Sequence, residues 1–164
     1  MREAAFLAVD LGAESGRVVR VDWGASELRF TELRRFANRP LWQGEALTWN
    51  LGALFSEIVL GLGEAAKSGP APQSIGVDTW GIDYTLLGPD GRLLASPYCY
   101  RDARVLGVAA RVHETLSAER LYALCGLQEL PFNTLYQLAA DLAIQGPAPF
   151  AAAKRLLFIP DALN

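Results

Sequence analysis

A short turn of small residues near the amino terminus constrains the fold of this chain more than any other feature of its sequence. An apolar run at residues 5–9 leads into this turn, and an alternating run at residues 18–23 leaves it. Such runs on either side of a glycine-containing turn are typical of a β-hairpin. A later alternating run extends the pattern, so we expect a meander of three strands at about residues 5–10, 16–23 and 27–36.

A helix and another strand are predicted after the meander. Asn50 is a good N-cap, and apolar residues recur after it at helical spacing until the Ser-Gly-Pro stop at residues 68–70. A short apolar strand at residues 74–79 comes next. Strand, helix and strand in this order predict a right-handed crossover and a partly parallel sheet. With more helices expected from Arg104 onward and a buried strand at residues 156–159, the fold class is α/β.

The same patterns predict which residues are buried. Segment 37–48 is rich in Asn, Pro, Gln and Gly, so we expect a long surface loop. We expect Trp42 and Trp49 to pack on the domain, and the alternative is that they face a ligand. Gly61 and Gly63 are expected to weaken the first helix and to permit close packing on the sheet. The residues expected to face inward from that helix are Leu51, Leu54, Phe55, Ile58, Val59, Leu62, Ala65 and Ala66. From a helix at about 133–144 they are Leu135, Leu138, Ala139 and Leu142.

Composition narrows the classes of protein. At 164 residues, 51% hydrophobic and 20% charged, the chain suits one globular domain with a sizeable core. A net charge of -3 without a basic run gives no electrostatic footprint for nucleic acid. Neither a membrane span nor a signal peptide pattern is found, which favours the cytoplasm. Cys99 and Cys125 lack metal-site spacing, and His113 is expected on a surface helix without a chemical role.

The first turn has the residues of a phosphate site. Small residues leave backbone N–H groups free to converge on an anion, and Ser15 and Arg17 add a hydroxyl and a guanidinium suited to phosphate oxygens. Asp10 at the edge of the turn is the candidate ligand for a magnesium ion that accompanies phosphate. Glu14 argues against this interpretation, because a second carboxylate repels phosphate unless it points outward. The alternative is that the glycines only provide the unusual backbone angles of a tight turn.

A second polar stretch follows the strand at residues 74–79. It places Asp78, Trp80, Gly81 and Asp83 close together in the sequence. An aromatic face covers the C–H groups of a sugar, while carboxylates and backbone groups bind its hydroxyls. The alternative for Trp80 is that it fills the core.

Two later stretches have structural interpretations. Arg101 and Asp102 open a helix, where capping and a surface ion pair are expected more than a ligand contact. Residues 130–138 read as a capped helix with an apolar entry.

Taken in order, five stretches resemble the amino-terminal part of the FGGY family of carbohydrate kinases. Each motif alone is weak, but five in this order and spacing are specific, and they cover nearly the whole chain. The stretches are Val-Asp-Leu-Gly-Ala-Glu-Ser-Gly-Arg (9–17), Gly-Val-Asp-Thr-Trp-Gly-Ile-Asp (76–83), Tyr-Arg-Asp-Ala-Arg (100–104), Leu-Pro-Phe-Asn-Thr-Leu-Tyr-Gln-Leu (130–138) and Phe-Ile-Pro-Asp (158–161).

This resemblance implies a ribonuclease-H-like, actin-like ATPase domain that binds ATP and Mg²⁺ between two lobes and phosphorylates a ketose, L-rhamnulose, at its C1 hydroxyl. Asp10 is implied at the metal ion. The residues implied at ATP and its phosphates are Asp10, Gly12, Ala13, Glu14, Ser15, Gly16 and Arg17. Those implied at the sugar are Trp80, Gly81, Asp83, Arg101 and Phe132.

The resemblance also implies what residues 1–164 lack. The general-base aspartate of such kinases is expected beyond Asn164, so no catalytic residue is expected within the chain, and the second lobe is expected to be absent. We therefore expect an inactive amino-terminal portion of the first domain, incomplete at its carboxyl-terminal end. Its uncovered interlobe face is expected to cause self-association.

Two other functions remain open at this point. A metal-dependent nuclease of ribonuclease-H-like fold would use clustered carboxylates, for which Asp10, Asp78 and Asp83 are the candidates. The net negative charge argues against it. A non-catalytic sugar-binding or nucleotide-binding module would bind ligand without turnover.

Overall fold

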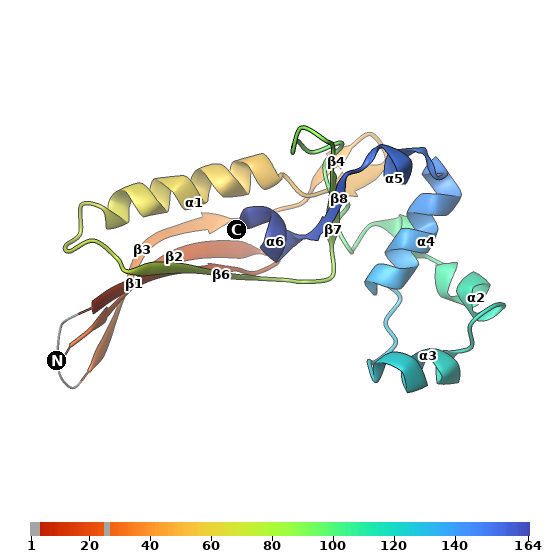
Figure 1. The fold of residues 1–164 in the computed structure, drawn as a ribbon, viewed down its shortest axis with the longest axis horizontal. Helices are drawn as coiled ribbons and strands as arrows, with labels where there is room; N and C mark the ends of the chain where they lie inside the picture. The colour runs from red at the N-terminus through yellow and green to blue at the C-terminus, as the bar shows by residue number, and fades with distance from the viewer. Residues whose placement is uncertain (1–3, 25–26) are drawn as a thin grey trace. The chain divides into compact units, whose positions relative to one another are not determined.

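The computed structural model describes residues 4–24 and 27–164, and the chain forms two compact units (Figure 1). Unit 1 comprises Met1–Leu41, Trp49–Gly81 and Ile159–Asn164, and unit 2 comprises Trp42–Thr48 and Ile82–Phe158. Each unit is therefore assembled from segments that are separated in the sequence.

A four-stranded mixed sheet forms unit 1. Its strands are β1 (Ala4–Leu11), β2 (Ser15–Trp23), β3 (Leu28–Ala37) and β6 (Ser74–Thr79), in the order β3-β2-β1-β6. The first three form an antiparallel meander, whereas β6 pairs parallel to β1. The predicted meander, crossover and mixed sheet are confirmed.

Helix α1 (Leu51–Ala65) packs against β2 and β3, and α6 (Ile159–Leu163) packs beside β6 (Figure 1). The predicted N-cap is confirmed, because the Asn50 side chain accepts a hydrogen bond from the Ala53 amide at 2.9 Å. The buried residues of α1 are Leu51, Leu54, Ile58, Gly61 and Ala65. The helix thus buries only about one residue in each turn. Phe55 and Val59 were expected to face inward, but both are exposed.

Unit 2 combines a β-ladder with short helices. Strands β7 (Tyr84–Leu87) and β8 (Arg155–Phe158) pair antiparallel. The helical elements are η1 (Ala103–Val105), α2 (Val108–His113), α3 (Ala118–Cys125), α4 (Thr134–Gln145) and α5 (Ala148–Ala152). An apolar cluster of Val105, Val108, Tyr136 and Ala140 joins η1, α2 and α4.

Two predictions, about segment 37–48 and about Trp42, are wrong. Segment 37–48 is not only a loop, because it forms a hairpin of β4 (Leu41–Gln43) and β5 (Ala46–Thr48). Trp49 is buried as expected, but Trp42 on β4 is 66% exposed.

The inward face of α4 also differs from the prediction. Leu135 and Leu142 are exposed, whereas Tyr136, Gln137, Ala140 and Asp141 are buried. Apolar periodicity fails here because the polar side chains of Gln137 and Asp141 have buried hydrogen-bonding partners, so they are stable inside unit 2.

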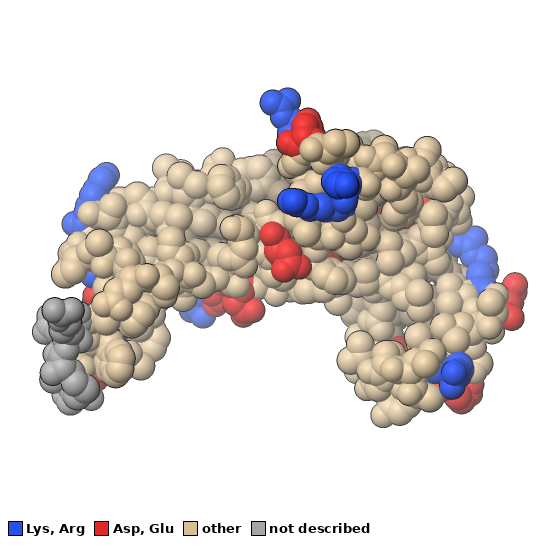
Figure 2. Space-filling view, in the orientation of Figure 1, with Lys and Arg blue, Asp and Glu red and all other residues tan. Residues whose placement is uncertain are grey.

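On the face shown in Figure 2, acidic and basic side chains are interspersed, and uncharged residues make up most of the surface. This face therefore has no basic patch of the kind that binds nucleic acid. Among the residues that the structure describes, no helix is long and apolar enough to cross a membrane.

Two glycines of α1 provide a test of its packing. An ideal Cβ on Gly61 would lie 2.5 Å from Val18 Cγ2, whereas one on Gly63 would have nothing within 4 Å. We expect Gly61→Ala to lower the free energy of unfolding by about 1–3 kcal/mol through overpacking. Gly63→Ala is the matched control and should raise it by about 0.5–1 kcal/mol through helix propensity. Urea unfolding followed by circular dichroism measures both, and equal effects would contradict this packing of α1.

Candidate functional site

The turn between β1 and β2 is held by hydrogen bonds from two directions. Gly12 N donates to Ser15 O at 2.8 Å across the turn. Asn38, which follows β3 and is buried, donates from its backbone N to Glu14 O at 2.9 Å and from Nδ2 to Gly12 O at 2.8 Å. Asn38, the residue after β3, therefore fixes the carbonyl groups of Gly12 and Glu14. The turn is an ordered part of unit 1.

The glycines of this turn do not have the unusual backbone angles that one interpretation assigned to them. Neither Gly12 nor Gly16 has a positive φ angle. Instead, an ideal Cβ on Gly16 would lie 2.4 Å from the Phe36 ring and 2.6 Å from Leu11 Cδ2. Gly16 is therefore required by close side-chain packing.

Asp10 and Arg17 face each other across the hairpin. They are register partners, and Arg17 Nη2 and Nε lie 2.7 and 2.8 Å from Asp10 Oδ2. Both side chains are nearly half exposed, so each charge is accessible to a ligand. On its other side, Asp10 is the register partner of Asp78 on β6. The sheet thus brings two carboxylates and a guanidinium to one edge.

The residues after β6 complete the part of the candidate site in unit 1. The rings of Trp80 and Trp49 have centroids 4.6 Å apart, so the half-buried Trp80 packs on a buried tryptophan. Gly81 has open space around it, because an ideal Cβ there would meet nothing within 4 Å. Core packing of Trp80 is thus observed, and a sugar contact of Trp80 or Gly81 stays a prediction.

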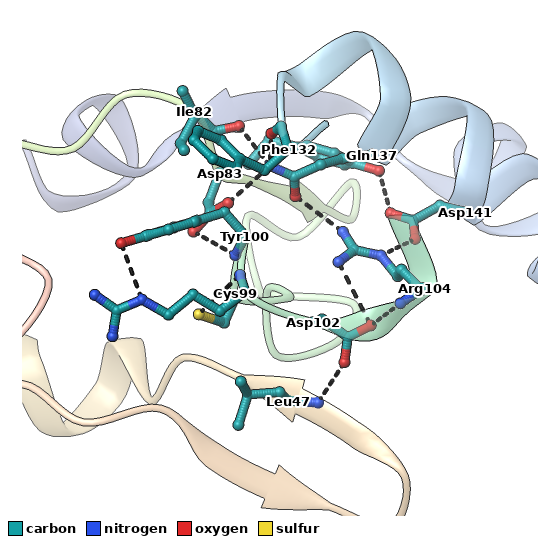
Figure 3. Close-up of polar contacts among 12 residues, drawn as sticks. Leu47, Ile82, Asp83, Cys99, Tyr100, Asp102, Arg104, Phe132, Gln137 and Asp141 are labelled. Carbon is teal, nitrogen blue, oxygen red and sulfur yellow. Dashed lines mark hydrogen bonds and ion pairs between the residues drawn. The ribbon is translucent and has the colours of Figure 1, made fainter. Parts of the chain in front are cut away.

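Three of the predicted sugar residues come together in unit 2, around Tyr100 (Figure 3). Asp83 is fully buried and accepts a hydrogen bond through Oδ2 from Tyr100 N at 3.2 Å. The Phe132 and Tyr100 rings have centroids 5.4 Å apart. Arg101 donates from Nε to Tyr100 Oη at 3.1 Å. Tyr100 thus joins Asp83, Arg101 and Phe132 into one cluster, which we call the Tyr100 cluster.

A buried guanidinium lies next to this cluster and was not predicted. The Arg104 side chain is 5% exposed, and its Nε donates to Asp141 Oδ1 at 2.7 Å. Its Nη2 donates to Gln137 Oε1 at 2.9 Å, and its Cζ lies 3.9 Å from the Tyr98 ring centroid. Tyr84 Oη donates to the other oxygen of Asp141.

Asp102 is part of the same network. Its Oδ1 accepts from Arg104 N at 2.9 Å and its Oδ2 accepts from Leu47 N at 2.7 Å (Figure 3). The predicted capping by Asp102 is therefore confirmed, although the helix it caps is the short 3₁₀ helix η1. The expected surface ion pair of Arg101 and Asp102 is wrong, because Asp102 is buried and its ion-pair partner is the buried side chain of Arg104.

The sequence held one signal for this network. Gln137 and Asp141 are four residues apart in α4, and such a spacing places two side chains on one helix face. The sequence does not reveal Arg104 as the partner of these two side chains, because Arg104 is 37 residues away from Asp141.

Burial raises the pKa of two groups near Arg104 and Asp83, the Cys99 thiol and the Tyr84 phenol, and so keeps both neutral at pH 7. It raises the pKa of the Cys99 thiol to about 11. The pKa of the Tyr84 phenol is also raised, first by burial and then by its hydrogen bond to Asp141. Neither group is thus a thiolate or phenolate nucleophile. The groups around Arg104 and Asp83 therefore interact by hydrogen bonds and by the Arg104–Asp141 ion pair.

The sites that the sequence predicted therefore fall into two groups. Unit 1 contains the phosphate and metal residues together with Trp80 and Gly81, and unit 2 contains Asp83, Arg101 and Phe132. Among the residues at 4–24 and 27–164, no group of three or more His, Cys, Asp or Glu side chains has the arrangement of a metal site. The carboxylate cluster that a two-metal nuclease requires is thus not found in this part of the chain.

Solved structures define the class of the fold. The chain superposes on the gluconate kinase from Lactobacillus acidophilus with a TM-score of 0.79 and 14% identity, over 99% of this chain and 32% of that one. The xylulose kinase from Rhodospirillum rubrum gives a TM-score of 0.78 and 16% identity, over 99% of this chain and 33% of that one. The chain has the α/β, actin-like fold of sugar kinases, as predicted.

Sequence relatives are more specific. The rhamnulokinase of Pectobacterium atrosepticum is 45% identical over 157 residues, which are 94% of this chain and 32% of the relative. That of Bacteroides thetaiotaomicron is 40% identical over 159 residues, which are 97% of this chain and 33% of the relative. The chain thus spans about a third of the length of these relatives. No family model matches it. The resemblance predicted from the five stretches is confirmed.

His113 lies outside both groups of site residues, but it links α2 to the segment before α4. Its Nδ1 lies 2.9 Å from Leu116 O and its Nε2 lies 2.7 Å from Glu129 Oε1. The hydrogen bond to Glu129 is the largest cause that raises the His113 pKa, and the same bond lowers the Glu129 pKa. Tyr136 and Glu119 are the other titratable groups that act on this pair.

This pair predicts a pH dependence of stability. The raised His113 pKa gives stability that is present below its ordinary pKa of 6.5 and is lost as the pH rises through the raised pKa. The lowered Glu129 pKa gives stability that is present above 4.5 and is lost as the pH falls through the lowered pKa. Glu129→Gln should therefore destabilise the chain most between pH 4.5 and 6.5. The control is Glu114→Gln at an exposed position, and a pH-independent effect of Glu129→Gln in urea unfolding would contradict the pairing.

Proposed function

We propose that this chain provides part of an ATP-dependent carbohydrate kinase that phosphorylates a ketose, most specifically L-rhamnulose at its C1 hydroxyl. The observation that carries this proposal is the 40–45% identity to rhamnulokinases over 94–97% of the chain. In this proposal residues 1–164 are the amino-terminal portion of the first, actin-like domain. The general base and the second lobe are contributed by sequence that corresponds to the remaining two thirds of the relatives.

The phosphate side of the proposed site is the β1–β2 hairpin. Asp10 fits a magnesium ion, because its carboxylate is accessible and oxygen ligands are what Mg²⁺ prefers. When bound, Mg²⁺ would neutralise negative charge on the ATP phosphates. Arg17, now paired with Asp10, would bind phosphate oxygens, and the fixed residues 12–16 would place backbone groups beside them.

The residues proposed to contact the sugar form two separate sets, Trp80 and Gly81 within unit 1 and the Tyr100 cluster within unit 2. An indole face and two further aromatic rings suit the C–H faces of a sugar, and Arg101 supplies hydrogen-bond donors for its hydroxyls. Asp83 is buried and holds Tyr100, so its support for the site runs through Tyr100. A direct contact between Asp83 and the sugar stays a prediction.

Phosphoryl transfer depends on positioning both substrates and on stabilising charge. The proposed phosphate turn and the Tyr100 cluster offer groups of this kind. The nuclease alternative is less favoured, because only Asp10 and Asp78 of its three carboxylates are register partners, whereas Asp83 is buried and hydrogen-bonded to Tyr100 N and Gln137 Nε2. A non-catalytic binding module would bind ligand without forming product, so an assay of turnover distinguishes it from a kinase.

The proposal is tested by comparing two proteins. The 164-residue chain alone should bind L-rhamnulose and Mg²⁺-ATP weakly and form no rhamnulose 1-phosphate. A chimera in which this chain replaces the matching segment of the Pectobacterium atrosepticum rhamnulokinase should phosphorylate L-rhamnulose in a coupled assay. Turnover by the chain alone, or a chimera that prefers D-xylulose or glycerol, would overturn the proposal.

The same preparation tests the expected self-association. Large apolar side chains are exposed on both units, among them Phe30 on β3 and Tyr122 on α3. Sedimentation should therefore detect oligomers of the isolated chain. A strictly monomeric species would contradict an uncovered interface.

Asp10 is tested by Asp10→Asn in the chimera. Loss of the charge beside the phosphates should lower kcat by at least about a hundredfold and leave the KM for L-rhamnulose within about threefold, because the metal ion acts mainly on the transition state. The control is Asp90→Asn, which removes an exposed carboxylate from a surface turn. An unchanged kcat for Asp10→Asn would remove Asp10 from the mechanism.

A further inference from the structure

The side-chain amide of Gln137 in α4 is the point where the polar contacts of unit 2 converge (Figure 3). The residue is 1% exposed. Its Nε2 lies 3.1 Å from Ile82 O, 2.9 Å from Asp83 Oδ1 and 3.0 Å from Phe132 O. Its Oε1 accepts from Arg104 Nη2 at 2.9 Å. This one side chain thus contacts the segment just before β7, the loop before α4, and η1.

The chemistry of these partners fixes the orientation of the amide. Arg104 has only donors, so the Gln137 atom that faces it must be the oxygen. Backbone carbonyls and a carboxylate have only acceptors, so the atom that faces Ile82, Asp83 and Phe132 must be the nitrogen. Two N–H groups are shared among three acceptors, which makes the position unsuitable for a side chain that lacks donors.

Through two of these bonds, Gln137 reaches the whole Tyr100 cluster. Its bond to Asp83 Oδ1 orients the carboxylate whose other oxygen accepts from Tyr100 N. Its bond to Phe132 O fixes the loop that places the Phe132 ring against the Tyr100 ring. Arg101 is reached through Tyr100 Oη.

The amide is itself held by the buried ion pair. Arg104 is fixed by Asp141 and by the Tyr98 ring, so the oxygen of Gln137 has a rigid donor. Asp141 and Gln137 lie on the same helix, which connects the ion pair and the amide through one rigid element.

We propose that Gln137 is a positioning residue, which sets the geometry of Asp83, Tyr100 and Phe132 without touching the substrate. The consequence for sugar binding rests on the proposed function, whereas the positioning itself does not. Gln137 acts only within unit 2, so its loss should affect the sugar and spare the phosphate hairpin of unit 1.

The test uses Gln137→Met in the 164-residue chain, since Met keeps the length of the side chain and removes its hydrogen bonds. Gln145→Met is the matched control, because Gln145 is exposed at the end of the same helix. Hydrogen exchange read by mass spectrometry should show protection reduced at least about tenfold in peptides that cover residues 98–102 and 129–134 of Gln137→Met only. L-Rhamnulose, titrated by NMR, should bind at least about tenfold more weakly to Gln137→Met, with Mg²⁺-ATP affinity within about twofold.

A second variant keeps the test decisive if Gln137→Met unfolds. Gln137→Glu places a carboxylate against Asp83 at pH 8, and its protonated form at low pH regains one donor. Protection of residues 98–102 and sugar affinity should therefore recover together as the pH is lowered to 5, while the wild-type chain serves as the reference at each pH.

Each outcome separates the two proposals. Equal protection in the Gln137 variants and the Gln145 control would overturn the positioning role. Lost protection with unchanged sugar affinity would support the positioning role and would overturn its consequence for sugar binding. A wild-type chain that shows no L-rhamnulose binding would count against the proposed function, while the protection data would still decide the role of Gln137.

Discussion

The structure of unit 2 depends on the burial of one guanidinium. A buried charge is tolerated only where it is paired and hydrogen-bonded, and removal of one partner of a buried ion pair typically costs about 3–5 kcal/mol. Arg104 meets this requirement through Asp141, Gln137 and the Tyr98 ring. Because these partners come from α4 and from the segment before η1, the pairing holds together parts of the chain that local structure would leave independent. The Tyr100 cluster is built on this frame, since Gln137 joins it to Arg104.

Unit 1 meets a different constraint, which is close packing around two glycines. Gly16 lies against Phe36 and Leu11, and Gly61 lies against Val18, so a Cβ at either position would overlap a neighbouring side chain. Close packing of this kind restricts movement of α1 against the sheet. Strand register places the Asp10 and Arg17 side chains opposite each other at the proposed phosphate-binding turn. The two units therefore prepare binding groups by different means: strand register and close packing in one, and a buried polar network in the other.

Local sequence signals predicted much of this fold. Strand periodicity located the meander and β6, and the cap at Asn50 located the start of α1, because each signal depends on neighbouring residues. The buried face of α4 was not predictable in this way, since burial of Gln137 and Asp141 depends on a donor from another part of the chain. The buried pairing of Arg104 was not predicted for the same reason. Resemblance to a family located Asp83, Arg101 and Phe132, but only the folded chain places Tyr100 between them.

The most direct test of the account is a two-dimensional ¹H–¹⁵N NMR titration of the chain with L-rhamnulose, because this measurement detects weak binding and locates it by residue. The account predicts saturable shifts of the backbone amides of Tyr100, Arg101, Gly81 and Phe132. An equal concentration of glycerol should leave them unchanged. The absence of shifts at saturating sugar, or shifts confined to residues outside these segments, would contradict the assignment of this chain to the sugar side of a carbohydrate kinase.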